Sequence, residues 1–208
     1  MTEKKFSRNK QEKIDLIYDN FFKLILEKGY HKTSTNHIAK SAKISIGTIY
    51  KYFPKGKQDI MRKYFEDTME NIFNISGLYN VGENKIRDFL KDFILILYNN
   101  HKEKKAYNIA FRSAIQSDKM LLKAHKERLF DSFKNAAQKL RGKNEIFNQI
   151  PEERLIKLFI FLYNLINALI YHHLSVMRLF DTDMELTDYL SNLTTFSLQY
   201  LTRVDNKK

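Results

Sequence analysis

The chain has 208 residues, and its 36 Lys and Arg outnumber 24 Asp and Glu to give a formal net charge of +12. A hydrophobic fraction of 43% is too high for a disordered chain and is sufficient for a core in one or two domains. The absence of Cys excludes disulfides, thiolate zinc sites and a cysteine nucleophile.

The excess of positive charge is concentrated at one end of the chain. Residues 1–63 hold 15 Lys and Arg against 6 Asp and Glu, whereas residues 64–208 hold 21 against 18. This asymmetry is typical of a basic module attached to a near-neutral body, and the partner of such a module is a polyanion. An ordinary lysine-rich surface explains the charge alone equally well. Residues 1–13 are polar and basic and lack the apolar run of a secretory signal, so we expect a cytoplasmic protein.

Apolar residues recur at helical spacing along nearly the whole chain, and the three Val are far fewer than the 23 Leu. We therefore predict an all-α fold with about nine helices. In chain order they are expected near 9–28, 34–41, 46–52, 56–75, 84–100, 103–117, 119–141, 152–178 and 185–203. Gly29 suits a left-handed cap after the first helix, and the stretches 76–83 and 143–149 are expected to be connections.

The second and third expected helices are short and are joined by a tight turn. Thr33, Ser34 and Thr35 are all suited to cap the first of them, and Ser45 is suited to cap the second. Ile38 and Ala42 share one face, as do Ile49 and Phe53, so each helix has an apolar side to bury. Two short helices with a turn of about three residues are typical of a helix-turn-helix unit.

The outer side of the second short helix carries residues suited to duplex DNA. A recognition helix places its N-terminal residues against base edges, and Ile46, Gly47 and Thr48 occupy that place. Ile46 suits a thymine methyl group, Gly47 allows close approach of the backbone, and Thr48 suits a base or a phosphate. The donors that suit phosphates follow at Tyr50, Lys51, Tyr52, Lys55 and Lys57. Taken singly, each residue is explained equally well as an ordinary surface or core position.

Residues 29–57 resemble the N-terminal domain of the TetR/AcrR family of transcriptional regulators. The matching residues are Gly29-Tyr30, Thr33-Ser34-Thr35, Ile38-Ala39, Ala42, Ile44-Ser45, Gly47-Thr48-Ile49-Tyr50, Tyr52-Phe53 and Lys57. The resemblance implies a helix-turn-helix DNA-binding domain over 1–54 and a helical ligand-binding and dimerisation domain over 55–208. It also implies a homodimeric repressor that leaves a palindromic operator when a small hydrophobic effector binds.

The family's DNA contacts carry over residue by residue. They fall on Thr35, Asn36, Ile46, Gly47, Thr48, Tyr50, Lys51, Tyr52 and Lys57. The chain departs from the family's pattern at two places. Lys43 stands in the turn where Gly is common, and three residues rather than two separate Phe53 from Lys57. The second departure leaves open whether Lys55 or Lys57 contacts phosphate.

The resemblance further implies an effector pocket among the helices from 84 to 178. The candidate lining residues are Phe93, Leu97, Tyr107, Phe111, Phe159, Tyr163, Asn167 and His172. An acyl-CoA, a fatty acid, a drug or an aromatic metabolite would fit such an interior. An aromatic residue or Leu at this spacing is more often simply part of the core.

The segment 155–171 is apolar on nearly all sides but is shorter than the ~20 residues of a membrane span. A soluble helix of this kind must be covered on more than one side, either by a second subunit or within its own. We expect a homodimer through the helices near 152–178 and 185–203, and no membrane partner.

Other functional classes have little support in the sequence. The six His residues do not form an i, i+4 pair, and no Ser lies in a nucleophile-elbow pattern, so we expect no metal, no cofactor and no enzymatic activity. The main alternative is a helical lipid- or acyl-chain-binding module that lacks sequence-specific DNA binding.

Overall fold

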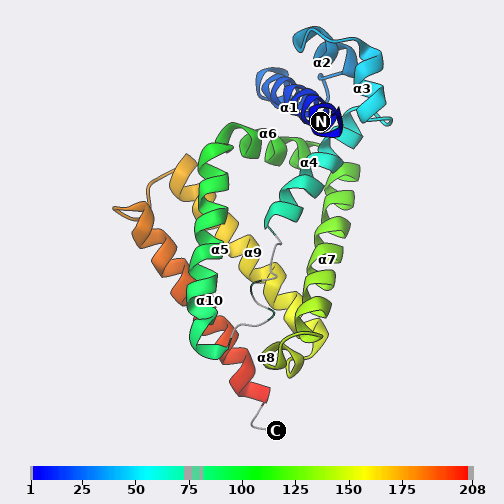
Figure 1. The fold of residues 1–208 in the computed structure, drawn as a ribbon. Helices are drawn as coiled ribbons and strands as arrows, with labels where there is room; N and C mark the ends of the chain where they lie inside the picture. Colours follow the sequence, from blue (N-terminus) through cyan, green and yellow to red (C-terminus); the bar gives the residue numbers. More distant parts are fainter. Residues whose placement is uncertain (1, 73–76, 78, 80–81, 206–208) are drawn as a thin grey trace. The chain divides into compact units, whose positions relative to one another are not determined.

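The computed structural model describes the chain except for residues 1, 73–76, 78, 80–81 and 206–208. Within the described residues all regular structure is helical, which confirms the predicted fold class (Figure 1). The chain forms two packing units. One comprises Met1–Thr68 with Lys104–Lys126, and the other comprises Met69–Glu103 with Glu127–Lys208.

The first unit contains the start of α7 (Lys119–Arg141, up to Lys126) and five further helices around one apolar cluster. They are α1 (Thr2–Lys28), α2 (Thr35–Ser41), α3 (Ile46–Tyr52), α4 (Lys57–Ile72, up to Thr68) and α6 (Lys105–Ser117). The stripe expected on the first helix is buried, and its central residues Ile17 and Phe21 are fully covered. They pack with Ile38 of α2 and with Ile49 and Phe53 at the end of α3, so one core holds both short helices.

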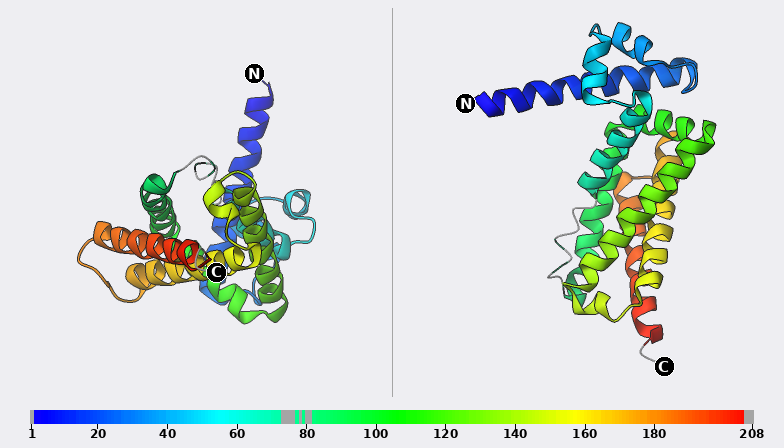
Figure 2. Two further views of the ribbon diagram at one scale, coloured as in Figure 1. Left: turned by 90° about the horizontal axis from the view of Figure 1, so that it is seen from below. Right: turned by 90° about the vertical axis from the view of Figure 1, so that its right-hand side faces the viewer.

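The second unit contains α5 (Glu83–Glu103), most of α7 (Lys119–Arg141), α8 (Glu145–Asn148), α9 (Glu152–Ser175) and α10 (Asp183–Asp205). Helix α5 packs against both α9 and α10 (Figures 1 and 2). Ile94 and Leu97 of α5 meet Ile166 of α9 and Leu186 of α10 in one buried cluster. A separate cluster joins α7 and α8 to the start of α9 through Leu140, Phe147 and Leu155.

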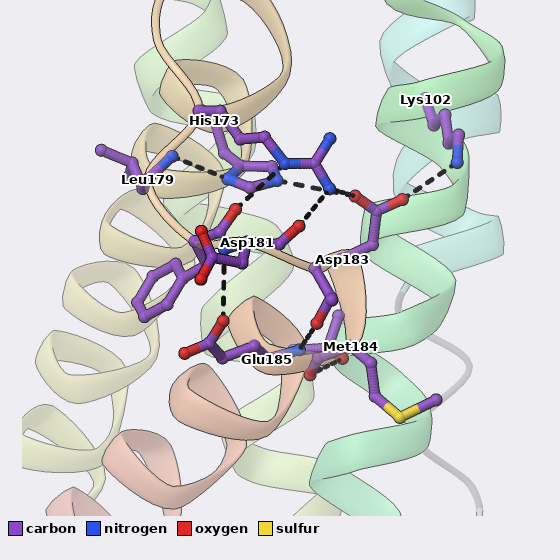
Figure 3. Close-up of polar contacts among 11 residues, drawn as sticks. Lys102, His173, Leu179, Asp181, Asp183, Met184 and Glu185 are labelled. Atoms are coloured by element: carbon purple, nitrogen blue, oxygen red, sulfur yellow. Dashed lines mark hydrogen bonds and ion pairs between the residues drawn. The ribbon is translucent and has the colours of Figure 1, made fainter.

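A polar cluster fixes the connection between α9 and α10 (Figure 3). The Lys102 ammonium on α5 donates to Asp183 Oδ2 at 3.0 Å, and an Arg178 guanidinium nitrogen lies 3.4 Å from Asp183 Oδ1. His173, near the end of α9, accepts the Leu179 N–H at Nδ1 over 3.0 Å, and its Nε2 lies 3.6 Å from Asp183 Oδ1. The connection is thus held to α5 and to both helices that it joins.

The observed helices differ from the expected ones at several ends. Helix α1 begins at Thr2 rather than near residue 9, and the four-residue α8 interrupts the stretch expected to be a connection. Four residues are too few to show helical spacing, although Asn144 supplies a cap by accepting the Ile146 N–H at 3.0 Å. The expected end of the fourth helix, residues 73–75, lies outside the described residues.

The packing units also divide the chain differently from the expected boundary after residue 54. The beginning of α4 and all of α6 pack with α1, because Tyr64, Ala110 and Ala114 complete the core of the first unit. The division between packing units therefore falls within α4 and within α7. The functional domains expected over 1–54 and 55–208 stay a prediction.

Helix α9 is the one described helix that is long and apolar enough to cross a membrane, with 33% of its most apolar window buried. This is weak evidence for a span because a core helix has the same composition. One side of α9 is buried in the second unit through Leu162, Ile166 and Ile170.

Candidate DNA-binding surface and apolar cavity

The two short helices begin at side-chain caps, as the sequence predicts. Ser34 Oγ accepts the His37 N–H at 3.3 Å, and His37 Nδ1 accepts the Ser34 N–H at the same distance, which forms a reciprocal capping box. Ser45 Oγ accepts the Thr48 N–H at 3.1 Å at the start of α3. These bonds satisfy amides that would otherwise lack partners and so fix where each helix begins.

The turn between α2 and α3 is a Schellman motif with lysine in the position that glycine usually takes. The Ile44 N–H reaches the Ala39 carbonyl at 3.0 Å, and the Lys43 N–H reaches the Lys40 carbonyl at 3.3 Å. Lys43 has a φ of 53°, in the left-handed region. The chain therefore keeps the usual turn conformation in spite of its departure from the family's sequence pattern.

The outward side of α3 is exposed while its inward side is buried. Ile46 and Tyr50 are 40% and 46% exposed, whereas Ile49 is fully buried. Gly47 and Lys51 are exposed as well, and Thr48 is half-buried because its hydroxyl lies 2.9 Å from Ser45 Oγ. Large apolar and aromatic side chains at the surface of so short a helix are available to a partner.

Three elements meet beside Tyr50. The Tyr50 hydroxyl lies 3.3 Å from Thr35 Oγ1, at the beginning of α2. Gly56, which follows α3, is the third element at this place and has a φ of 65°. A Cβ on Gly56 would lie 3.0 Å from Thr35 Cγ2. Only glycine combines that left-handed backbone with so close an approach. Thr35 is half-buried and the neighbouring Asn36 is exposed, so the predicted residues of α2 adjoin those of α3.

The two lysines after α3 differ in their surroundings. The Lys57 ammonium donates to the Tyr30 carbonyl at 2.9 Å and lies 4.1 Å from the centre of the Tyr30 ring. Burial lowers the pKa of Lys57. The side chain of Lys55 is exposed, and its backbone N–H donates to the buried Asp59 carboxylate at 2.6 Å. Tyr52 is half-buried and packs against the core of the first unit.

An apolar cavity of about 80 Å³ lies within the second unit. Of the predicted pocket residues, Phe93 of α5 and Phe159 and Tyr163 of α9 line it. The other lining residues are Phe89, Leu90, Phe133, Ala136, Leu140, Phe147, Leu162, Ile166, Thr194 and Leu198. Apolar side chains dominate the walls, so this cavity suits hydrocarbon rather than a charged group.

The remaining predicted pocket residues lie elsewhere. Tyr107 and Phe111 of α6 pack in the first unit, where the Tyr107 hydroxyl donates to Asp19 and Phe111 stacks with Phe65. Helical spacing indicates that such residues are buried, but it does not indicate which residues they pack against. Leu97 is fully buried among α5, α9 and α10 and does not line the cavity.

Two polar residues named for the pocket have other places on α9. The Asn167 amide donates to the Tyr163 carbonyl at 2.7 Å, and its Oδ1 lies 2.6 Å from Nε2 of the buried His101. An amide on an apolar helix needs a hydrogen-bond partner, and Asn167 finds its partners within the chain. His172 is half-buried and does not line the cavity.

No group of three or more His, Asp and Glu suited to a metal ion occurs among the residues that the structure describes. The geometry therefore presents two features, the exposed face of a helix-turn-helix unit and an apolar cavity in the other unit.

Comparison with known proteins agrees with this geometry. The family described as bacterial regulatory proteins of the tetR family matches residues 17–64. An uncharacterised helix-turn-helix transcriptional regulator of Bacillus subtilis is 34% identical over 100 residues, and a fatty acid metabolism regulator of the same organism is 40% identical over 62 residues. These alignments cover 47% and 30% of this chain but only 33% and 31% of the two curated relatives.

Solved structures share the fold over most of the chain. A TetR-family regulator from Syntrophomonas wolfei has a TM-score of 0.68 at 18% identity, with 91% of this chain and 96% of that chain covered. A fatty acid degradation regulator from Bacillus halodurans has a TM-score of 0.60 at 17% identity, with 89% and 94% covered. Identities this low establish the shared fold alone.

Proposed function

We propose that this chain, in which residues 17–64 match the tetR family of bacterial regulatory proteins, is a dimeric transcriptional repressor. In this proposal it binds a palindromic operator in the cytoplasm and is released by an apolar effector. The observation that carries the DNA-binding part is the exposed face of α3. Ile46 and Tyr50 project from it, while Ile49 on the opposite side is buried in the core. Catalysis has no part in the proposal.

Gly47 gives independent support for this face as the DNA contact. Its backbone is not left-handed, and a Cβ there would meet only Ser45 Oγ, at 3.7 Å. Glycine inside a helix costs roughly 0.5–1 kcal/mol relative to alanine. No contact among the described residues of the first unit requires glycine at this position. A closely approaching DNA surface accounts for it, because a backbone without a side chain fits deeper into the major groove.

The phosphate contact after α3 is assigned to Lys55. Its side chain is exposed, whereas the Lys57 ammonium is already held by the carbonyl and the ring of Tyr30. In this account Lys57 holds the residues before α2 in place, and Lys55 reaches the DNA backbone as a flexible cation. Thr35, Asn36, Thr48, Lys51 and Tyr52 complete the proposed contact surface.

The dimer is proposed to form through α9 and α10. Phe161 on α9 is 59% exposed and Phe196 on α10 is 66% exposed, and Tyr189 and Tyr200 are exposed on α10 as well. Several exposed aromatic side chains on two neighbouring helices are typical of a protein–protein interface. A second copy of the chain would bury them. A two-fold dimer also places two copies of α3 for the two halves of a palindrome.

The effector is proposed to carry a long apolar chain, such as a fatty acid or its coenzyme A thioester. The cavity walls are nearly all apolar. A relative named for fatty acid metabolism is 40% identical over 62 residues, and a regulator named for fatty acid degradation shares the fold. The cavity of about 80 Å³ is smaller than the ~300 Å³ or more that ligand pockets usually enclose. An acyl chain that enters must therefore enlarge the cavity. Its binding favours a conformer of the protein in which the helices around the cavity are further apart.

Selection from a random pool of duplexes tests the DNA-binding part. The selected sequences should be palindromic, with half-sites about 10–10.5 base pairs apart or a multiple of that distance. Light scattering should give a particle of about twice the 24.9 kDa chain mass. If the protein enriches no duplex sequence, the proposal is contradicted. If it binds acyl chains but enriches no duplex sequence, the lipid-binding alternative is favoured.

Competition by lauric and palmitic acids and by their coenzyme A thioesters tests the effector part. The affinity for the selected duplex should fall as an acyl chain is added, and free coenzyme A serves as the control without an acyl chain. Release by free coenzyme A, or no release by any acyl compound, would contradict an apolar effector.

A further inference from the structure

A second basic feature lies in the first unit beside the face assigned to base contacts. It is a cleft of about 390 Å³ between α1, the end of α3 and α4. The lysines that line it among the described residues are Lys10 and Lys13 from α1, Lys51 from α3 and Lys63 from α4. We call this group the lysine cleft. Three helices therefore bring positive charge to one place.

The charges in the lysine cleft are only partly compensated. The Lys63 ammonium lies 3.0 Å from Asp67 Oδ1, which neutralises that lysine. Among the described residues, Lys10, Lys13 and Lys51 form no ion pair with a carboxylate, and all three side chains are exposed. Converging ammonium groups repel one another, and an anion in the cleft removes that repulsion.

The position of the lysine cleft indicates which anion fits. Lys51 and Tyr52 form its wall at the C-terminal end of α3, and the N-terminal end of the same helix carries the residues proposed to read bases. Lys10 and Lys13 lie in the N-terminal half of α1. In Figure 2 the dark blue end of α1 extends beyond the short helices. The cleft therefore continues the proposed DNA surface along α3 and onto α1.

The chemistry of the walls favours a long polyanion over a small bound ligand. Lysines supply flexible point charges, and among the described residues no arginine, which could clamp one phosphate with a bidentate pair, lines the cleft. Exposed ammonium groups on both α1 and α3 suit the repeated charges of a DNA strand.

We propose that the lysine cleft binds backbone phosphates of DNA outside the bases that α3 reads, so that each half-site extends beyond the recognition helix. This inference rests on the proposed DNA-binding function. Lys10 and Lys13 contribute affinity and salt dependence without sequence preference, because phosphates carry no direct base information.

The test compares K10Q/K13Q with wild type and with K23Q/K28Q, which removes the same charge from the other end of α1. Affinity for the duplex selected by the wild-type protein is measured between 50 and 200 mM salt. Each lost phosphate contact lowers the slope of log K against log salt by about 0.9. The affinity deficit of K10Q/K13Q should therefore shrink about 12-fold over this range if two contacts are lost, and K23Q/K28Q should keep the wild-type slope.

A wild-type slope in K10Q/K13Q would overturn the inference while leaving the proposed function intact. A wild-type protein that prefers no duplex sequence would overturn both. Phosphate ethylation interference on the wild-type complex gives a second measurement that needs no variant, and the flanking phosphates should interfere. If inorganic phosphate alone saturates the cleft at millimolar concentration and flanking ethylation has no effect, the cleft is a small-anion site and the inference fails.

Discussion

Gly47→Ala should stabilise the protein and weaken its binding to DNA, two effects of opposite sign from one methyl group. On the stability side, the added Cβ makes an ordinary contact with Ser45 Oγ at 3.7 Å, and the backbone is one that alanine adopts freely. The gain expected from removing a helical glycine is roughly 0.5–1 kcal/mol. For a protein of this size that raises Tm by about 1–4 °C.

On the binding side, the same methyl group occupies the space that the major groove is proposed to fill. Forcing an extra methyl into a closely packed contact typically costs about 1–3 kcal/mol. Because each 1.4 kcal/mol is a factor of ten, affinity for the selected duplex should fall by about 5- to 150-fold.

Thermal unfolding and equilibrium DNA binding of the same preparations measure both effects. Gly142→Ala is the matched control, since its Cβ would meet the Gln138 carbonyl at 3.5 Å in the second unit, far along the chain from α3. It should leave DNA affinity unchanged. If Gly47→Ala is stabilised and binds DNA as tightly as wild type, the α3 N-terminus does not contact the duplex. If Gly47→Ala instead lowers the free energy of unfolding, Gly47 does not destabilise the fold and this reasoning is wrong.

Three further substitutions test separate parts of the account. Lys43→Gly should raise stability by about 0.5–1 kcal/mol in urea unfolding, because relief of the left-handed backbone, about 1–2 kcal/mol, exceeds the entropy cost of glycine; a loss of stability would contradict the strained turn. Burial alone would raise the pKa of Asp59, but the hydrogen bonds from Lys55 and Arg62 outweigh burial and hold that pKa below its usual value. Wild type should therefore exceed Asp59→Asn in unfolding free energy above about pH 4 and lose that advantage as the pH falls further, and a difference that is constant down to pH 2 would contradict this. Ala136→Leu should fill the apolar cavity, leave operator affinity unchanged and abolish release by palmitic acid, whereas normal release would show that the effector binds elsewhere.

The short helices of the first unit were predictable because their signals are local. Ser34 and Ser45 lie directly before the helices that they cap, and Ile38 and Ile49 mark the buried faces within one or two turns. The observed bounds of α2 and α3 therefore agree with the expected ones to within a residue. The left-handed conformation of Gly29, with a φ of 83°, was predictable for the same reason.

Contacts between residues distant in the sequence were not predictable in this way. The Lys57 ammonium faces a carbonyl 27 residues earlier, so the sequence alone did not distinguish it from Lys55. Tyr107 was expected in the effector pocket, but its helical spacing indicates only that it is buried and not which residues cover it. Its hydrogen-bond partner Asp19 lies 88 residues away in the sequence. The lysine cleft likewise combines residues from three helices, and no spacing in the sequence relates Lys10 to Lys51.

The central claim is sequence-specific DNA binding by α3, and the ratio of two affinities tests it most directly. Binding of the wild-type protein to its selected duplex and to a scrambled duplex of equal length should be measured at about 0.15 M salt. The account predicts that the selected duplex binds at least about 10³-fold more tightly. A ratio near one would mean that the exposed face of α3 does not read bases, and would contradict the account.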